Sequence, residues 1–240
     1  MERARRAFEV GDDAAALALW SALSDEGVLR ARSNLGGLHM EGRGVPRDAE
    51  TAVRLFRSAA AGGDALAQQN LALAYYEGRG VAADAAEAAR WYGKAAEAGL
   101  ADAEDMLSWL YFEGIGVARD YVAARRWAEA AARQGKAAAE CRLGRIHHNA
   151  LGTARDPAAA ARWFARAARQ GDAEAQGMLG AAYHLGLGVA RDQAQAFRWL
   201  TLALRRGNEA AGGFLIRVGQ VITPDERAAA ERLIAAGETA

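Results

Sequence analysis

Three side chains in the sequence are of types that bind zinc or copper. Cys141 and His148 are seven residues apart, two turns along one helical face, and His184 follows His148 by 36 residues. Two helical turns rise by ~10 Å and stacked hairpins are separated by a similar distance, whereas the ligand atoms of one ion lie within ~4 Å of one another. We therefore expect these residues to serve packing or partner contact, with neither a metal nor another cofactor.

The sequence lacks the motifs of common catalytic sites. It has no Gly-x-Ser-x-Gly elbow, no phosphate loop ending in Gly-Lys-Ser or Gly-Lys-Thr, no His-Glu-x-x-His and no Cys-x-x-Cys. Gly-x-Gly pairs such as Gly78 and Gly80 are explained by a recurring turn between helices. His39 and His147 stand at repeat positions that elsewhere hold Tyr, which predicts packing. We therefore predict that the chain is not an enzyme.

The sequence repeats with a fixed period of 36 residues, and this repeat determines which helices carry the residues named above. Three kinds of residue follow it without an insertion: glycines, aspartates and large apolar residues. The clearest series are Gly44, Gly80, Gly116, Gly152 and Gly188; Asp48, Asp84, Asp120, Asp156 and Asp192; and Leu55, Trp91, Trp127, Trp163 and Trp199. The chain therefore contains five repeats in register.

Each repeat is predicted to be a pair of helices. Apolar residues recur every four positions before Gly78, which ends the first helix because glycine tolerates a positive φ. Asp84 then caps the second helix, and Asp156 followed by Pro157 gives the same signal more sharply. One such pair cannot bury its own apolar face, so neighbouring pairs must stack.

The repeat pattern resembles the Sel-one-like repeat family, a relative of the tetratricopeptide repeat. The residues that carry it are best seen in the fifth unit: Leu179, Gly180, Tyr183, Gly186, Gly188, Val189, Asp192, Ala196, Trp199, Ala203 and Gly207. The resemblance implies an all-α, right-handed superhelical α-solenoid of 36-residue helix-turn-helix repeats. We expect a single repeat domain over 1–240, with a partial repeat at 1–27, five full repeats at 28–207, and a partial repeat with a capping helix at 208–240.

The same resemblance implies a scaffold for protein interactions. Some bacterial members of the family are cysteine-rich and have been linked to penicillin binding or β-lactam hydrolysis, but this chain has only Cys141, so that activity is not carried over. We expect a non-enzymatic adaptor that binds a partner protein or peptide segment along its concave face. The alternative is a module that binds a small ligand or a metal.

First helices usually line the concave face of stacked hairpins, which suggests candidate partner-binding residues. Exposed Tyr, Trp, Phe, Met and Arg side chains there are of the types found at binding hot spots. The expected set is Gln69, Leu73, Tyr76, Asp105, Trp109, Phe112, Arg145, His148 and His184. The alternative for Met40, Tyr76 and Phe112 is packing between helices.

Charge narrows the choice of partner. Thirty basic and thirty acidic residues give a formal net charge of zero, so we expect no nucleic-acid partner. We also expect no membrane insertion, a monomer, and a cytoplasmic location, or a periplasmic one if an export signal has been removed. Glu41, Glu77 and Glu113 occupy equivalent positions beside the expected groove, which favours a basic segment there; the alternative is a solvated acidic face without a partner.

Two local features are informative. The fourth repeat has Ala150 where the others have glycine, and we expect the preceding Asn149 to adopt the positive φ and end the helix one residue early. Near the end of the chain, Thr223 and Glu226 have the spacing of a capping box that opens a closing helix to about Ala236.

Overall fold

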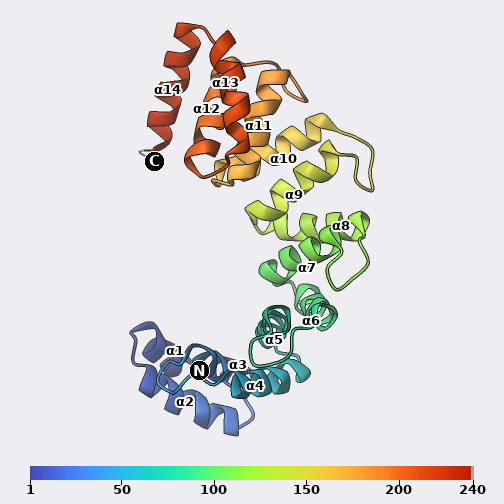
Figure 1. Cartoon of the computed structure of the whole chain (residues 1–240). Helices are drawn as coiled ribbons and strands as arrows, with labels where there is room; N and C mark the ends of the chain where they lie inside the picture. Colours follow the sequence, from blue (N-terminus) through green and yellow to red (C-terminus); the bar gives the residue numbers. More distant parts are fainter. Residues whose placement is uncertain (239–240) are drawn as a thin grey trace. The chain divides into compact units, whose positions relative to one another are not determined.

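The structure is a computed structural model that describes residues 1–238. Within that range it contains fourteen α-helices and no strand, as the sequence predicts (Figure 1). The helices are α1 (Glu2–Glu9), α2 (Asp13–Asp25), α3 (Leu29–Glu41), α4 (Ala49–Ala61), α5 (Ala65–Glu77), α6 (Ala85–Glu97), α7 (Ala101–Glu113), α8 (Tyr121–Arg133), α9 (Ala137–His148), α10 (Pro157–Arg169), α11 (Ala173–Leu185), α12 (Gln193–Arg205), α13 (Ala210–Val221) and α14 (Pro224–Glu238).

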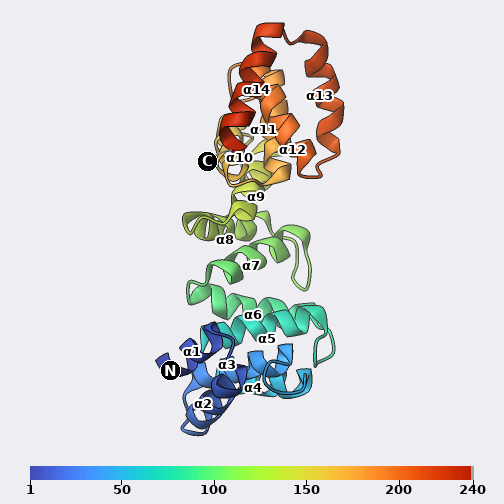
Figure 2. The ribbon, with the colours of Figure 1, turned by 90° about the vertical axis from the view of Figure 1, so that its left-hand side faces the viewer.

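The helices belong to two compact units, which are described separately. Unit 1 comprises residues 1–119 and holds α1 to α7, and unit 2 begins at Asp120 and holds α8 to α14. In unit 2, α12 packs against α11, α13 and α14, and these last four helices lie alongside one another in Figure 2. A single continuous repeat domain stays a prediction.

Aspartate side chains begin the second helix of each repeat, as predicted. The carboxylate of Asp84 accepts hydrogen bonds from the backbone amides of Ala86 and Glu87, both at 3.0 Å. At α10 the cap Asp156 precedes Pro157 at the first helical position, where a missing N–H costs nothing. Asp12, Asp64 and Asp172 also cap helices, which the sequence analysis did not anticipate.

Glycines end most of the first helices in the left-handed conformation. Gly78 has φ 69° at the end of α5, and Gly80 has φ 71° two residues later. Gly80 is also constrained by space, because a Cβ there would lie 2.1 Å from the carbonyl oxygen of Ala49 at the start of α4. The turn thus brings two neighbouring hairpins into backbone contact.

The fourth repeat departs from this pattern in a way that was predicted only in part. Helix α9 ends at His148, one residue early as expected, but the prediction that Asn149 takes the positive φ is wrong. Asn149 has φ −97°, and Ala150 adopts φ 56°. Ala150 therefore keeps the left-handed conformation that glycine has at this position in the other repeats, and Leu151 N–H closes the turn on the Ile146 carbonyl oxygen at 3.0 Å.

The core combines small alanines with a smaller number of larger apolar side chains. In unit 1, Phe56 and Leu71 lie in one buried cluster, and in unit 2 Phe164, Leu179 and Trp199 lie in another. Many of the alanines between them are fully buried, which allows the helices to approach closely.

The last helix is held by the predicted capping box. Thr223 Oγ1 accepts from the Glu226 amide at 3.3 Å, and Glu226 Oε2 accepts from the Thr223 amide at 2.8 Å. These hydrogen bonds lower the pKa of Glu226, because they stabilise its carboxylate. Helix α14 therefore starts where the sequence predicts.

Candidate partner-binding site

The nine residues expected to contact a partner fall in both units. Gln69, Leu73, Tyr76, Asp105, Trp109 and Phe112 lie in unit 1, and Arg145, His148 and His184 lie in unit 2. The expectation that Phe112 is exposed is wrong: only 5% of it is accessible. Met40, at the same position two repeats earlier, is likewise 8% exposed and belongs to a core cluster. Met40 and Phe112 therefore pack between helices, as the alternative interpretation held, whereas Tyr76 at the same repeat position is only half-buried.

The other apolar candidates of unit 1 remain accessible. Tyr76 on α5 and Trp109 on α7 are half-buried and meet edge to face, with ring centroids 5.8 Å apart and planes at 81°. Leu73, one turn before Tyr76, is 37% exposed. These three side chains form a partly exposed apolar surface across α5 and α7.

A cavity of about 560 Å³ lies in unit 1 among α1, α2, α3 and α5. Its apolar wall includes Phe8, Trp20 and Leu66, and the amide side chains of Asn34 and Asn70 also line it. The sequence analysis missed this cavity because it did not anticipate α1. The one indication of this helix in the sequence was the apolar Phe8, which lies in the segment assigned only to a partial repeat.

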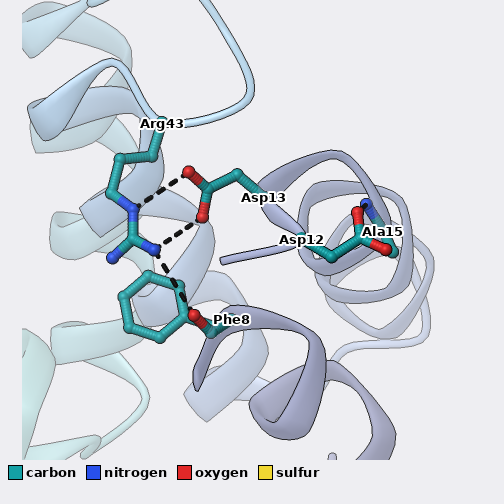
Figure 3. A network of polar contacts seen from close by, with 5 residues as sticks. All are labelled: Phe8, Asp12, Asp13, Ala15 and Arg43. Carbon is teal, nitrogen blue, oxygen red and sulfur yellow. Dashed lines mark hydrogen bonds and ion pairs between the residues drawn. The ribbon is translucent and has the colours of Figure 1, made fainter. Parts of the chain in front are cut away.

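Helix α1 is held in place by Arg43, from the turn after α3. The Arg43 guanidinium donates from Nη2 to Asp13 Oδ1 at 2.6 Å and from Nε to Asp13 Oδ2 at 3.2 Å (Figure 3). It also donates to the Phe8 carbonyl oxygen at 3.4 Å and lies over the Phe8 ring, 3.8 Å from its centroid. One arginine thereby fixes the phenylalanine that lines the cavity.

A second cavity, of about 240 Å³, continues from the first along α3 and α5. The two share Gly37, Glu41 and Asn70, so together they form one groove, which we call the unit 1 groove. Gly37 leaves its floor open, because nothing lies within 4 Å of the position where a Cβ would be. Leu73 and Glu77 line the second cavity. The groove therefore reaches the apolar surface around Tyr76.

Acidic and amide groups border the unit 1 groove. Arg5 and Arg30 line it but are neutralised, since Arg5 bonds to Glu2 at 3.2 Å and Arg30 to Asp64 at 2.7 Å. Glu41 forms no ion pair with any described residue. The side-chain amides of Asn34 and Asn70 likewise make no hydrogen bond within the described part of the chain. The groove thus offers a carboxylate and two amides to a ligand.

The unit 2 candidates have different surroundings. Arg145 Nε lies 3.5 Å from Glu174 Oε1, and His184 Nδ1 is hydrogen-bonded to Gln193 Oε1 at 2.9 Å. His148 lines an apolar cavity of about 240 Å³ and meets the edge of Phe164 at a centroid distance of 6.5 Å. Burial lowers the pKa of His148, and Arg155 adds to the effect by repulsion.

Cys141 is buried, with 4% of its surface exposed. Burial raises the pKa of its thiol, and the nearby carboxylate of Asp172 raises it further. The thiol form is a poor nucleophile and a poor metal ligand. Among the described residues, no three His, Cys, Asp or Glu side chains gather in a way that could hold a metal ion.

The sequence of all five repeats matches the family model of the Sel1 repeat. The matched segments are 29–64, 65–100, 101–136, 137–172 and 173–208. They account for most of the chain, so the chain belongs to the Sel1 repeat family. It is a helical scaffold of a kind that generally lacks catalytic activity.

Two solved structures are similar over nearly the whole chain. A Sel1 repeat protein from Oxalobacter formigenes is 30% identical, with a TM-score of 0.84 and 93% of each chain covered. A protective antigen present in uropathogenic Escherichia coli strains, which displays the Sel1-like repeat fold, is 32% identical with a TM-score of 0.82. That match covers 98% of this chain and 55% of the antigen's chain, so this chain spans about half of the antigen. No curated protein matches the sequence.

No helix within residues 1–238 has the length and apolar character needed to cross a membrane.

Proposed function

We propose that this chain is a non-enzymatic interaction scaffold that binds a basic segment of a partner protein in the unit 1 groove. The observation that carries the proposal is the continuity of the groove. Two cavities share Gly37, Glu41 and Asn70, and the exposed apolar surface around Leu73 adjoins them. A site this long fits an extended or helical segment of several residues.

The side chains of the groove suit such a segment in three respects. Trp20 and Leu73 in the groove, and Trp109 on the adjoining surface, offer apolar contact area, and tryptophan is enriched at binding hot spots. Asn34 and Asn70 offer both donors and acceptors to a peptide backbone. Glu41 and Glu77 supply negative charge at equivalent positions of successive repeats, although Glu77 is partly neutralised by Arg79 at 3.2 Å. These features favour lysine or arginine in the partner.

The proposal is tested with a peptide selected on the intact chain from a displayed library of random sequences. We expect the selected peptides to be basic and to bind with association rates that fall as ionic strength rises from ~50 to ~500 mM. Trp109→Ala should weaken binding by ~2 kcal/mol or more, and Leu73→Ala by about 1 kcal/mol.

Leu204→Ala is the matched control, because Leu204 is exposed to a similar extent, 42% against 37% for Leu73, but lies on α12 in unit 2. It should leave peptide affinity unchanged. Equal affinities for the parent, Trp109→Ala and Leu73→Ala, together with unchanged helicity, would place the binding site elsewhere.

A further inference from the structure

A cavity of about 440 Å³ in unit 2 lies among the turn between α10 and α11, helix α12 and helix α14. Three arginines line it: Arg169, Arg198 and Arg206. Trp199 and Leu233 provide part of an apolar wall. None of the nine residues expected to contact a partner belongs to it.

The positive charge of this cavity is not balanced from within the protein. No aspartate or glutamate lines the cavity, and none of the three arginines forms an ion pair with a described residue. Arg198 lies over the ring of Trp199, 4.5 Å from its centroid. Arg206 packs on the backbone of Gly171, where a Cβ would meet its Nη1 at 2.8 Å. Two of the guanidinium groups are thus supported by packing and remain without a counter-ion.

Two buried polar atoms at the cavity have no hydrogen-bond partner. Gln176 is 3% exposed, and its Nε2 donates to the Ala168 carbonyl oxygen at 3.1 Å, but its Oε1 accepts nothing. The Nε of Arg198 is also buried without an acceptor. Buried polar groups are normally paired, so one unmet acceptor and one unmet donor in the same cavity indicate a missing ligand.

The preceding repeat has an ion pair at the equivalent position. Glu140, 36 residues before Gln176, is 1% exposed, and its carboxylate accepts from Arg166 at 2.6 Å and from Gln170 at 2.8 Å. The equivalents of Arg166 and Gln170 in the fifth repeat are Leu202 and Arg206. The fifth repeat thus has a neutral amide, like Gln68 in the second, where the fourth has Glu140, and a leucine where the fourth has Arg166, while other arginines surround the site. A carboxylate would have to come from outside.

We propose that this cavity binds a carboxylate group of a peptide. The carboxylate lies between Arg198 and Arg206, a neighbouring peptide N–H donates to Gln176 Oε1, and an apolar side chain packs on Trp199 and Leu233. Inorganic phosphate fits less well, because it would leave the apolar wall uncovered. The proposal does not depend on the function proposed for the unit 1 groove.

The test uses three small probes on the intact chain, followed by NMR: N-acetyl-alanyl-alanyl-leucine, the same peptide as its C-terminal amide, and an amidated peptide with an internal aspartate. We expect saturable shifts of the Gln176 side-chain amide and of Arg198 Nε–H with a carboxylate-bearing peptide, and affinity at least about tenfold lower for the peptide without one. Tighter binding of the free-acid peptide assigns a terminal carboxylate, and tighter binding of the aspartate peptide assigns a side-chain carboxylate. Inorganic phosphate that binds as tightly as either would overturn the assignment to a peptide.

Variants then locate the site. Arg198→Gln and Arg206→Gln should each weaken the carboxylate peptide about fivefold or more, because each removes one guanidinium charge. Arg162→Gln is the matched control, since Arg162 precedes Trp163 as Arg198 precedes Trp199 but does not line the cavity. Its affinity should equal that of the parent. Parent-like affinity in both cavity variants, with unchanged circular dichroism, would overturn the proposal.

Discussion

Replacing Gly80 by alanine is expected to destabilise unit 1 by about 3 kcal/mol or more. Two costs add at this position. The residue has φ 71°, where an L side chain is strained by about 1–2 kcal/mol. Its new Cβ would also lie 2.1 Å from the carbonyl oxygen of Ala49, an atom of the backbone that cannot rotate away. Relieving that overlap requires α4 and the turn to separate, at a further cost of about 1–3 kcal/mol.

Gly63→Ala is the control that separates the two costs. Gly63 has φ 94°, but nothing lies within 4 Å of the position that its Cβ would take. Gly63→Ala should therefore lower the free energy of unfolding by only about 1 kcal/mol, the cost of the strained backbone alone. Urea unfolding followed by circular dichroism measures both variants. A loss for Gly80→Ala no larger than that for Gly63→Ala would show that the contact between hairpins is not tight.

The second large effect is expected from Arg166→Leu, at about 3 kcal/mol of lost stability. Arg166 Nη2 lies 2.6 Å from Glu140 Oε1 and also donates to the Ala132 carbonyl oxygen at 3.1 Å. Because the Glu140 side chain is only 2% exposed, removing the arginine leaves a buried carboxylate that accepts a hydrogen bond from Gln170 but has lost its counter-ion. Breaking a fully buried pair from one side costs ~3–5 kcal/mol, and the low end of that range applies here because the Arg166 side chain is 46% exposed.

The fifth repeat supplies the rescuing change. There the equivalent residues are Gln176 and Leu202, and Gln176 donates to the Ala168 carbonyl oxygen as Arg166 does to that of Ala132. The double variant Glu140→Gln with Arg166→Leu should therefore recover most of the loss, to within about 1 kcal/mol of the parent. Thermal unfolding of the two single variants and the double variant measures the coupling. If the stability loss of the double variant equalled the sum of the losses of the two single variants, the residues of the fifth repeat would not substitute for those of the fourth.

The sequence predicts the helices well because their signals are local. The period of 36 residues, the cap at Asp84 and the capping box at Thr223 each depend on a few neighbouring residues, and the structure confirms all three. The φ of Asn149 was predicted wrongly for the same reason. A preference for left-handed backbone was assigned to one residue, whereas the turn as a whole placed that conformation on Ala150.

The candidate site was predictable only in part, because exposure depends on contacts between distant segments. Tyr76 and Trp109 are only half-buried, as expected for partner-binding residues, yet Phe112, one turn after Trp109 on α7, is buried. The larger cavity of unit 1 requires α1, which carries no repeat signature. The arginine cavity of unit 2 is formed by segments that are separate in the sequence. The difference between Gln176 and Glu140 becomes informative only when the contacts of both side chains are known.

The most direct test of the central claim is to map where a bound basic segment lies. A library-selected basic peptide that carries a photoreactive phenylalanine analogue is bound to the intact chain, crosslinked and located by mass spectrometry. We expect crosslinks to α1, α2, α3 and α5, which line the groove, and to Trp109 on α7 at the adjoining apolar surface, with loss of these crosslinks when unlabelled peptide competes. Crosslinks confined to α4 and α6, or to helices of unit 2, would contradict the assignment of the unit 1 groove as the partner-binding site.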